Sequence, residues 1–203
     1  SSYDYSIASM VMEAAAGQDF LALVADEVAG PFELPSLCAD EVLTIIPGRV
    51  GGYFTARELE FLPTRMPGLS PPAGVDGCAN MGLSNPSFCW AGAGLLMSMP
   101  DLARFGAALL DGPKARITAA ERALLFTPLT EGTAEQPPLG LGWRVDADKP
   151  GRPRRHHAGT TPGGRCGLVL YPEQDLSIAL ASNTMMTPGD VLGAASELAD
   201  LFG

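Results

Sequence analysis

The stretch RRHHAGTTPGG at residues 154–164 contains both histidines of the chain, side by side. An imidazole on a strand edge can donate or accept a proton near neutral pH, and the glycine that follows lets another chain approach the backbone closely. Free backbone N–H groups beside them can stabilise the oxyanion that forms during acyl transfer. The alternative is a basic strand that runs into a glycine turn, with histidines that serve only the fold.

The two histidines are expected to differ. Side chains alternate between the two faces of a strand, so His156 and His157 point in opposite directions. We take His157 and Gly159 as candidates for chemistry and His156 as a neighbour that belongs to the fold.

Other motifs with a known chemistry are missing or incomplete. GRVGGY at 48–53 and AGAGLL at 91–96 are rich in glycine, but neither has the Lys-Ser/Thr pair of a phosphate-binding loop or a full GxGxxG. The sequence contains no GxSxG and no HExxH. It therefore predicts neither a nucleotide site nor a zinc protease.

Composition restricts the partners. The chain has 203 residues, of which 46% are hydrophobic, which is enough for one domain with a real core. Its 13 basic and 23 acidic residues give a net charge of −10, which disfavours nucleic acid. No window reaches the roughly 20 apolar residues of a bilayer span. We expect no nucleic acid partner and no membrane span in this chain.

The cysteines do not predict a metal site. The four are scattered without a CxxC pair, and only two histidines could join them. Structural zinc is therefore not expected, and we expect no cofactor. Reduced and mostly buried thiols are the simplest prediction, with a Cys78–Cys89 disulfide as the alternative.

The first elements that could position the histidines are helices. Residues 5–16 are nearly all apolar or small and predict a buried helix. Residues 18–28 predict a second helix that packs antiparallel to the first. Residues 63–86 are dense in proline, glycine and serine, which predicts a long irregular excursion over the surface.

Two capped helices follow this excursion. Ser98 is the expected cap of a helix that ends near Gly112, with Asp101 in its first turn. A capping box from Thr118 to Glu121 is expected to start the next one.

After residue 138 the pattern becomes that of strands. LGLGWRV, RRHHAGT, CGLVLY and LSIALASN predict an antiparallel meander. A closing helix from about Asp190 carries an apolar stripe of Val191, Ala195, Leu198 and Phe202. We therefore expect a single α+β domain, with mainly helices and loops in 1–135 and the antiparallel strands plus a C-terminal helix in 136–203.

The histidine stretch resembles a known family. His157-Ala158-Gly159, followed by TTPGG and later by LSIALASN, is similar to the C-terminal portion of the β-lactamase-related serine hydrolases. This superfamily includes class C β-lactamases, penicillin-binding proteins, D-aminopeptidases and esterases, and its Lys-Thr-Gly box is often replaced by His-x-Gly.

Further motifs extend the resemblance over essentially the full chain. GRVGGY at 48–53, CWAGAGLLMSMPDLARFGAALLDG at 89–112 and LGLGWRV at 139–145 match the family in order and spacing. The resemblance implies a β-lactamase/transpeptidase-like fold, in which helices pack on an antiparallel sheet.

The start of the chain matches only part of a family motif. Members carry Tyr-x-Asn or Tyr-x-Ser, followed by a helix that usually ends in glycine. Laying this pattern on the sequence puts Ser1 in the middle position, Ser2 in the third and Gly17 at the helix end. The catalytic-type tyrosine would then be the residue before Ser1.

The family's Ser-x-x-Lys nucleophile box has no match. The two lysines, Lys114 and Lys149, are preceded three residues earlier by Asp111 and Asp146. We therefore expect the N-terminal strands and the nucleophile helix to lie outside this chain, which would be a fragment or one half of a cleaved or split enzyme. The N-terminal portion of the same protein is then an expected partner.

The resemblance implies a role for each candidate residue. The nucleophilic serine, with its lysine and tyrosine, would come from outside, and the backbone N–H of Thr160 would be one of two oxyanion donors. His157 would orient a hydroxyl or a substrate carboxylate, and Gly159 would let the substrate lie along the strand. Ser2 would join this polar cluster or serve only as a helix cap.

We therefore expect a serine hydrolase that acts on a small-molecule ester or amide through an acyl-enzyme. Histidine in place of lysine disfavours a β-lactam carboxylate as the ligand. Two alternatives stay open: an inactive member that uses the same site for binding or sensing, and an unrelated α+β domain. Because the strand edge would be unpaired, residues 1–203 alone are expected to be insoluble or inactive.

Overall fold

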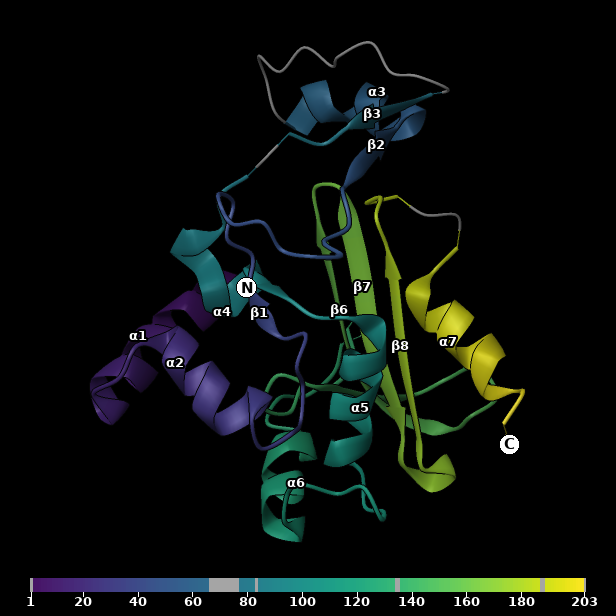
Figure 1. Ribbon diagram of the computed structural model, residues 1–203. Helices are drawn as coiled ribbons and strands as arrows, with labels where there is room; N and C mark the ends of the chain where they lie inside the picture. The colour runs from purple at the N-terminus through teal and green to yellow at the C-terminus, as the bar shows by residue number, and fades with distance from the viewer. Residues whose placement is uncertain (1, 66–76, 83, 134–135, 187–188, 203) are drawn as a thin grey trace.

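The computed structural model describes residues 2–65, 77–82, 84–133, 136–186 and 189–202 (Figure 1). Its centre is a four-stranded antiparallel sheet in the order β5-β6-β7-β8. The strands are β5 (Arg144–Ala147), β6 (Pro153–Thr161), β7 (Gly164–Tyr171) and β8 (Leu176–Ser182). A 3-10 turn, Pro172–Gln174, joins the last two strands. The predicted meander is confirmed.

The first strand is shorter than expected. Residues 139–143 of LGLGWRV lie outside the strand, apart from a single bridge between Leu139 and Arg144. Gly142 has φ +83, a left-handed conformation that interrupts an extended chain. Trp143 then enters the core with 9% exposure.

The sheet lies between two layers of helices. On one face, Leu168 and Leu170 pack in a buried cluster with Leu109 at the end of α5 (Met99–Leu109). On the other face, Val169 and Tyr171 pack against α7 (Val191–Ala199). Residues 167–171 of β7 are therefore buried on both faces, because successive side chains alternate between the two faces.

Helices α5 and α6 begin at the predicted caps. The Ser98 hydroxyl accepts a hydrogen bond from the N–H of Asp101, and a full capping box joins Thr118 to Glu121 at the start of α6 (Ala119–Phe126). The carboxylate of Asp101 also accepts hydrogen bonds from the amide and the hydroxyl of Ser36, which fastens the segment before β1 to this helix.

The two N-terminal helices are not an antiparallel pair. Helix α1 (Ser2–Ala16) is followed by α2 (Phe20–Val24), which continues as a π-helix, Ala25–Ala29. Their axes are bent by 85°. Gly17 in the short link has φ +66, which turns the chain sharply, so the prediction of antiparallel packing is wrong.

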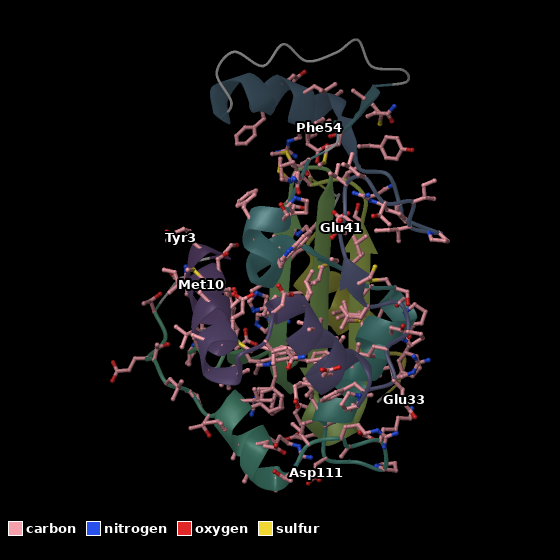
Figure 2. The ribbon with its side chains drawn as sticks, turned by 60° about the vertical axis from the view of Figure 1, so that its left-hand side comes forward. Tyr3, Met10, Glu33, Glu41, Phe54 and Asp111 are labelled. Carbon is pink, nitrogen blue, oxygen red and sulfur yellow. The ribbon has the colours of Figure 1, made fainter. Side chains whose placement is uncertain are left out.

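Helix α1 is also not buried. None of its residues is buried, and Tyr3, Met10 and Val11 are 73%, 67% and 64% exposed. Figure 2 shows Tyr3 and Met10 on the side of the helix that points away from the sheet. The inner side packs against α4 (Trp90–Ala93), where Gly92 lies against the carbonyl of Ser2. The outer side has no neighbour among the described residues, so the prediction of a buried helix is wrong.

The C-terminal helix departs from the prediction at its end. Val191 and Ala195 of the expected stripe are buried, but Phe202 is 69% exposed because α7 ends at Ala199.

Two short pairings complete the fold. Strand β1 (Cys38–Ala39) pairs with β4 (Leu95–Leu96). Strand β2 (Tyr53–Thr55) leads into α3 (Ala56–Arg65) and pairs with β3 (Cys78–Asn80). The expected irregular excursion at 63–86 is therefore wrong for the end of α3 and for β3, while residues 66–76 and 83 lie outside the described residues. A 3-10 turn, Ser87–Cys89, precedes α4.

The cysteines are free, but they are not mostly buried. Cys38, Cys78 and Cys166 are exposed and Cys89 is half-buried. The reduced state is as predicted, the burial is not, and the alternative Cys78–Cys89 disulfide is not formed. As for a membrane, no single described helix has the length and apolarity to cross one, although α1 and residues 20–29 pass that test when taken together as a bent pair.

Candidate active site

Strand β6 has two different halves. Residues 153–156, which we call the paired half, pair with β5, from Pro153 opposite Ala147 to His156 opposite Arg144. Arg155 and His156 also pair with β7 on the other side. Residues 157–161 pair with β7 on one side, and no described strand pairs with them on the other. We call residues 157–161 the open half of β6. Its edge away from β7 is therefore unpaired among the described strands; Figure 1 shows β6 beside β7.

The register decides which backbone groups face this edge. Thr161 and Gly164 close the two-residue turn between β6 and β7, and such a closing pair exchanges hydrogen bonds. Pairs then alternate, so the N–H and C=O groups of Ala158 and Thr160 point away from β7 and into the open edge. Gly159 and Thr160 are both exposed, and nothing lies within 4 Å of a Cβ placed on Gly159.

His157 is held at the start of the open half. Its Nδ1 lies 2.7 Å from the carbonyl oxygen of Gly142. A carbonyl can only accept, so Nδ1 carries the proton, and in the neutral ring Nε2 has a free lone pair. The ring also meets Tyr5 of α1 edge-to-face, with centroids 6.4 Å apart. His157 is therefore exposed, oriented and able to accept a proton or hydrogen bond at Nε2.

His156 has the opposite environment. It lies across from Val169, on the face covered by α7, and is 2% exposed. Its Nε2 is 3.4 Å from the carboxylate of Asp146, which Arg154 holds with hydrogen bonds of 2.7 and 3.1 Å. Burial lowers the pKa of His156, since the charges of Asp146 and Arg154 act in opposite directions on it. This histidine is a buried part of the sheet, as the alternation predicts.

The pKa of Asp146 in the same cluster is also lowered, but for a different reason. Burial by itself would raise it, but the hydrogen bonds from Arg154 and the charge of His156 outweigh burial and lower the pKa. Asp146 is therefore an ionised anchor for Arg154, beside the paired half of β6.

Three of the four predicted residues come together and one stands apart. His157, Gly159 and Thr160 lie along the open half of β6. Ser2 begins α1 and is exposed, one helical turn before Tyr5 and so on the same side of the helix. Among the hydrogen bonds of the described residues, none joins Ser2 to β6.

Sequence reasoning missed the two residues that hold His157. Gly142 was visible only as a glycine in a presumed strand, and Tyr5 only as a helix residue. A glycine beside a strand does signal a turned backbone, but no spacing shows that its carbonyl reaches an imidazole fifteen residues later.

A metal centre finds no support among the residues that the structure describes. They contain no group of three or more histidine, cysteine, aspartate or glutamate side chains placed to hold an ion.

Comparisons with known proteins give one family match and several solved structures with a similar fold. A family model described as Beta-lactamase matches residues 1–201. The fold is similar to a D-stereospecific amidohydrolase from Streptomyces sp., with 20% identity over 91% of this chain and 50% of that one, at a TM-score of 0.71. It is also similar to a D-amino acid amidase from Ochrobactrum anthropi SV3 complexed with D-phenylalanine, with 18% identity, 98% and 56% coverage, and a TM-score of 0.73.

An octameric penicillin-binding protein homologue from Pyrococcus abyssi is a third similar structure, with 14% identity, 98% and 42% coverage, and a TM-score of 0.74. The comparison with curated protein sequences gives no match. The chain spans about half the length of the solved structures that it matches. The expected α+β fold, with helices on an antiparallel sheet, is confirmed by these likenesses.

Proposed function

The chain belongs to the beta-lactamase family, and on that premise we propose that it supplies one wall of a serine hydrolase site that cleaves an ester or amide through an acyl-enzyme. The observation that carries the proposal is the open half of β6, where His157 is fixed by Gly142 and the backbone of Thr160 faces outward. A preorganised N–H beside a proton acceptor is what acyl transfer needs.

Thr160 is the proposed oxyanion donor. Its N–H points into the open edge and needs no movement to meet a developing negative charge. Ala158 offers a second outward-facing amide group, with which an extended substrate can pair as an added strand. Gly159 between them has no side chain to obstruct such a substrate.

His157 is the proposed acceptor at the site. With its proton on Nδ1 and held by Gly142, it presents Nε2 to a hydroxyl or to a substrate group. Tyr5 packs on the ring and limits its rotation. Ser2, on the same side of α1 as Tyr5, is proposed to add its hydroxyl to this polar cluster.

The nucleophile is proposed to come from an N-terminal portion of the same protein. The 203 residues contain no serine three positions before a lysine. The chain spans about half of the similar structures, and the outer apolar side of α1 is uncovered among the described residues. Such a portion would be this chain's partner at the site.

A second candidate is an inactive family member that binds a ligand at the same edge. The sequence favours it to the extent that neither lysine completes a Ser-x-x-Lys box. The two candidates differ in turnover alone, so a kinetic experiment separates them.

The test measures hydrolysis by the protein that contains this chain. The substrates are p-nitrophenyl acetate and a D-amino acid amide, the latter chosen because similar structures are named for D-stereospecific amide cleavage. His157→Ala is expected to lower kcat/KM by about 10²–10⁴-fold. Glu173→Gln, on an exposed residue of the turn before β8, is the control and should leave kcat/KM unchanged.

Two results would overturn the proposal. The first is undiminished hydrolysis by His157→Ala. The second is turnover by residues 1–203 alone, because it would remove the need for an external nucleophile. Specific ligand binding without turnover in the unsubstituted protein would favour the second candidate.

A further inference from the structure

The unit formed by β2, α3 and β3 stands at the end of the sheet where β6 turns into β7 (Figure 1). The N–H of Tyr53 donates to the carbonyl of Asn183 just past β8, at 2.9 Å. A Cβ on Gly52 would come within 2.7 Å of the carbonyl oxygen of Gly163, so this close approach requires glycine. The unit therefore rests directly on the turn that ends the open half of β6.

Glu58 of α3 ties this unit to the sheet. Its side chain is fully buried, at 0% exposure. One carboxylate oxygen accepts a hydrogen bond from the N–H of Thr55 at the end of β2, and the other accepts one from the N–H of Met186 beyond β8. Glu58 and Met186 are 128 residues apart in the sequence, so their hydrogen bond links the unit to the segment that follows β8.

The buried carboxylate of Glu58 depends on its hydrogen-bond donors. Burial alone would raise the pKa of Glu58, but the hydrogen bonds from Thr55 and Met186 outweigh it and lower the pKa. No ion pair among the described residues includes Glu58, so backbone N–H groups replace the water that the charge has lost. Displacing the unit from the sheet would take the carboxylate away from the N–H of Met186.

The unit lies in the path of a long substrate. A strand advances about 3.3 Å per residue, so a substrate paired with Ala158 and Thr160 reaches the turn after β6 within about two residues. Met81, which follows β3, lies at this turn with its sulfur against Gly163. The N–H of Met81 donates to the carbonyl of Gly52 at 2.9 Å, which fixes its position on the unit.

We propose that the β2–α3–β3 unit selects extended substrates with an apolar end through Met81, and that Glu58 is the positioning residue that holds the unit at the end of the open half of β6. The inference rests on the proposed hydrolase function. It assigns the discrimination between short and long substrates to residues outside His157, Gly159 and Thr160.

The test compares Glu58→Gln with Glu60→Gln in the protein that contains this chain. Glu60 is an exposed residue of the same helix and serves as the matched control. Glu58→Gln is expected to raise KM for p-nitrophenyl octanoate about tenfold, the loss of one apolar contact, with kcat and the hydrolysis of p-nitrophenyl acetate unchanged. Equal losses for both substrates, or no change for either, would overturn the proposal.

A second variant guards against a folding failure. Met81→Ala leaves Glu58 in place and is expected to raise KM for the octanoate by a similar factor, again without an effect on the acetate. An unchanged KM for the octanoate in Met81→Ala would contradict the assignment of selectivity to this residue.

Hydrogen exchange reads the anchor without any turnover. The N–H groups of Thr55 and Met186 should be protected in the unsubstituted protein and in Glu60→Gln, and should exchange at least tenfold faster in Glu58→Gln. Unchanged exchange would contradict the role of Glu58. If the protein hydrolyses neither ester, the proposed function fails, whereas the exchange result still reports on the anchor.

Discussion

The two halves of β6 are continuous in sequence but differ in what surrounds them. Residues 153–156 pair with β5, and the last two of them also with β7. This half carries the buried His156 beside the Asp146–Arg154 ion pair. Residues 157–161 lack a described neighbour on one side and are mostly exposed. The first half of β6 thus supports the sheet, and the second half carries the candidate site. The boundary between them lies where β5 begins, next to the turned backbone of Gly142.

The open edge of β6 is held in place by the parts of the sheet that surround it. The paired half and the buried residues 167–171 of β7 fix the position of the backbone, so the open half needs no side-chain packing of its own. Its amide groups stay directed outward because the register with β7 leaves them no alternative. Substitutions should therefore affect stability in one half and activity in the other.

The largest effect is expected for the β7 partner of the paired half. Leu170, opposite Arg155, has 0% exposure, and Leu170→Ala should lower the free energy of unfolding by about 2–5 kcal/mol. Cys166, opposite Gly159 in the open half, is exposed, and Cys166→Ala should change it by less than about 0.5 kcal/mol. Urea unfolding of both variants measures the contrast, and equal losses would remove the distinction between the halves.

The second effect concerns activity in the open half. Thr160→Pro removes the outward N–H but no ladder hydrogen bond to β7, so we expect kcat/KM to fall by about 10²–10³-fold with the fold retained. Thr160→Ala keeps the N–H and should retain activity. Equal losses in the two variants would mean that the side chain of Thr160, and not its amide, is what matters.

The third effect is a pH dependence confined to the paired half. Burial lowers the pKa of His156 in the folded state, among Asp146, Arg154 and Arg144. As the pH falls, the unfolded chain takes up a proton at His156 before the folded chain does. This part of the stability is therefore complete above the ordinary histidine pKa of about 6.5 and is lost as the pH falls below it. His156→Gln should remove this part of the acid dependence in thermal unfolding at pH 7 and pH 5. The same slope in both proteins would contradict it.

The sequence predicts most of the helix caps and strands, because their signals are local. Ser98, Thr118 and Glu121 cap as expected since a cap depends on residues three positions apart. The meander follows from alternating apolar residues between turn residues. The adjacent histidines separate into a buried and an exposed one for the same local reason.

What the sequence does not predict depends on contacts between distant segments. The contact between His157 and Gly142, and the burial of Glu58 under Met186, join residues whose spacing carries no period. The apolar residues of α1 predict a helix that is covered by other segments, but they do not show which segments cover it. Among the described residues its outer side is exposed. The bend after α1 follows from the φ of Gly17, which its residue type permits but does not impose.

The most direct test of the proposed half-site is to locate the nucleophile. The protein that contains this chain is treated with a fluorophosphonate, which forms a covalent adduct with an activated serine, and the adduct is mapped by peptide mass spectrometry. The account predicts a single adduct on a serine outside residues 1–203, formed more slowly in Thr160→Pro, because that variant lacks the oxyanion donor. An adduct on Ser2 or any other residue of this chain would contradict it.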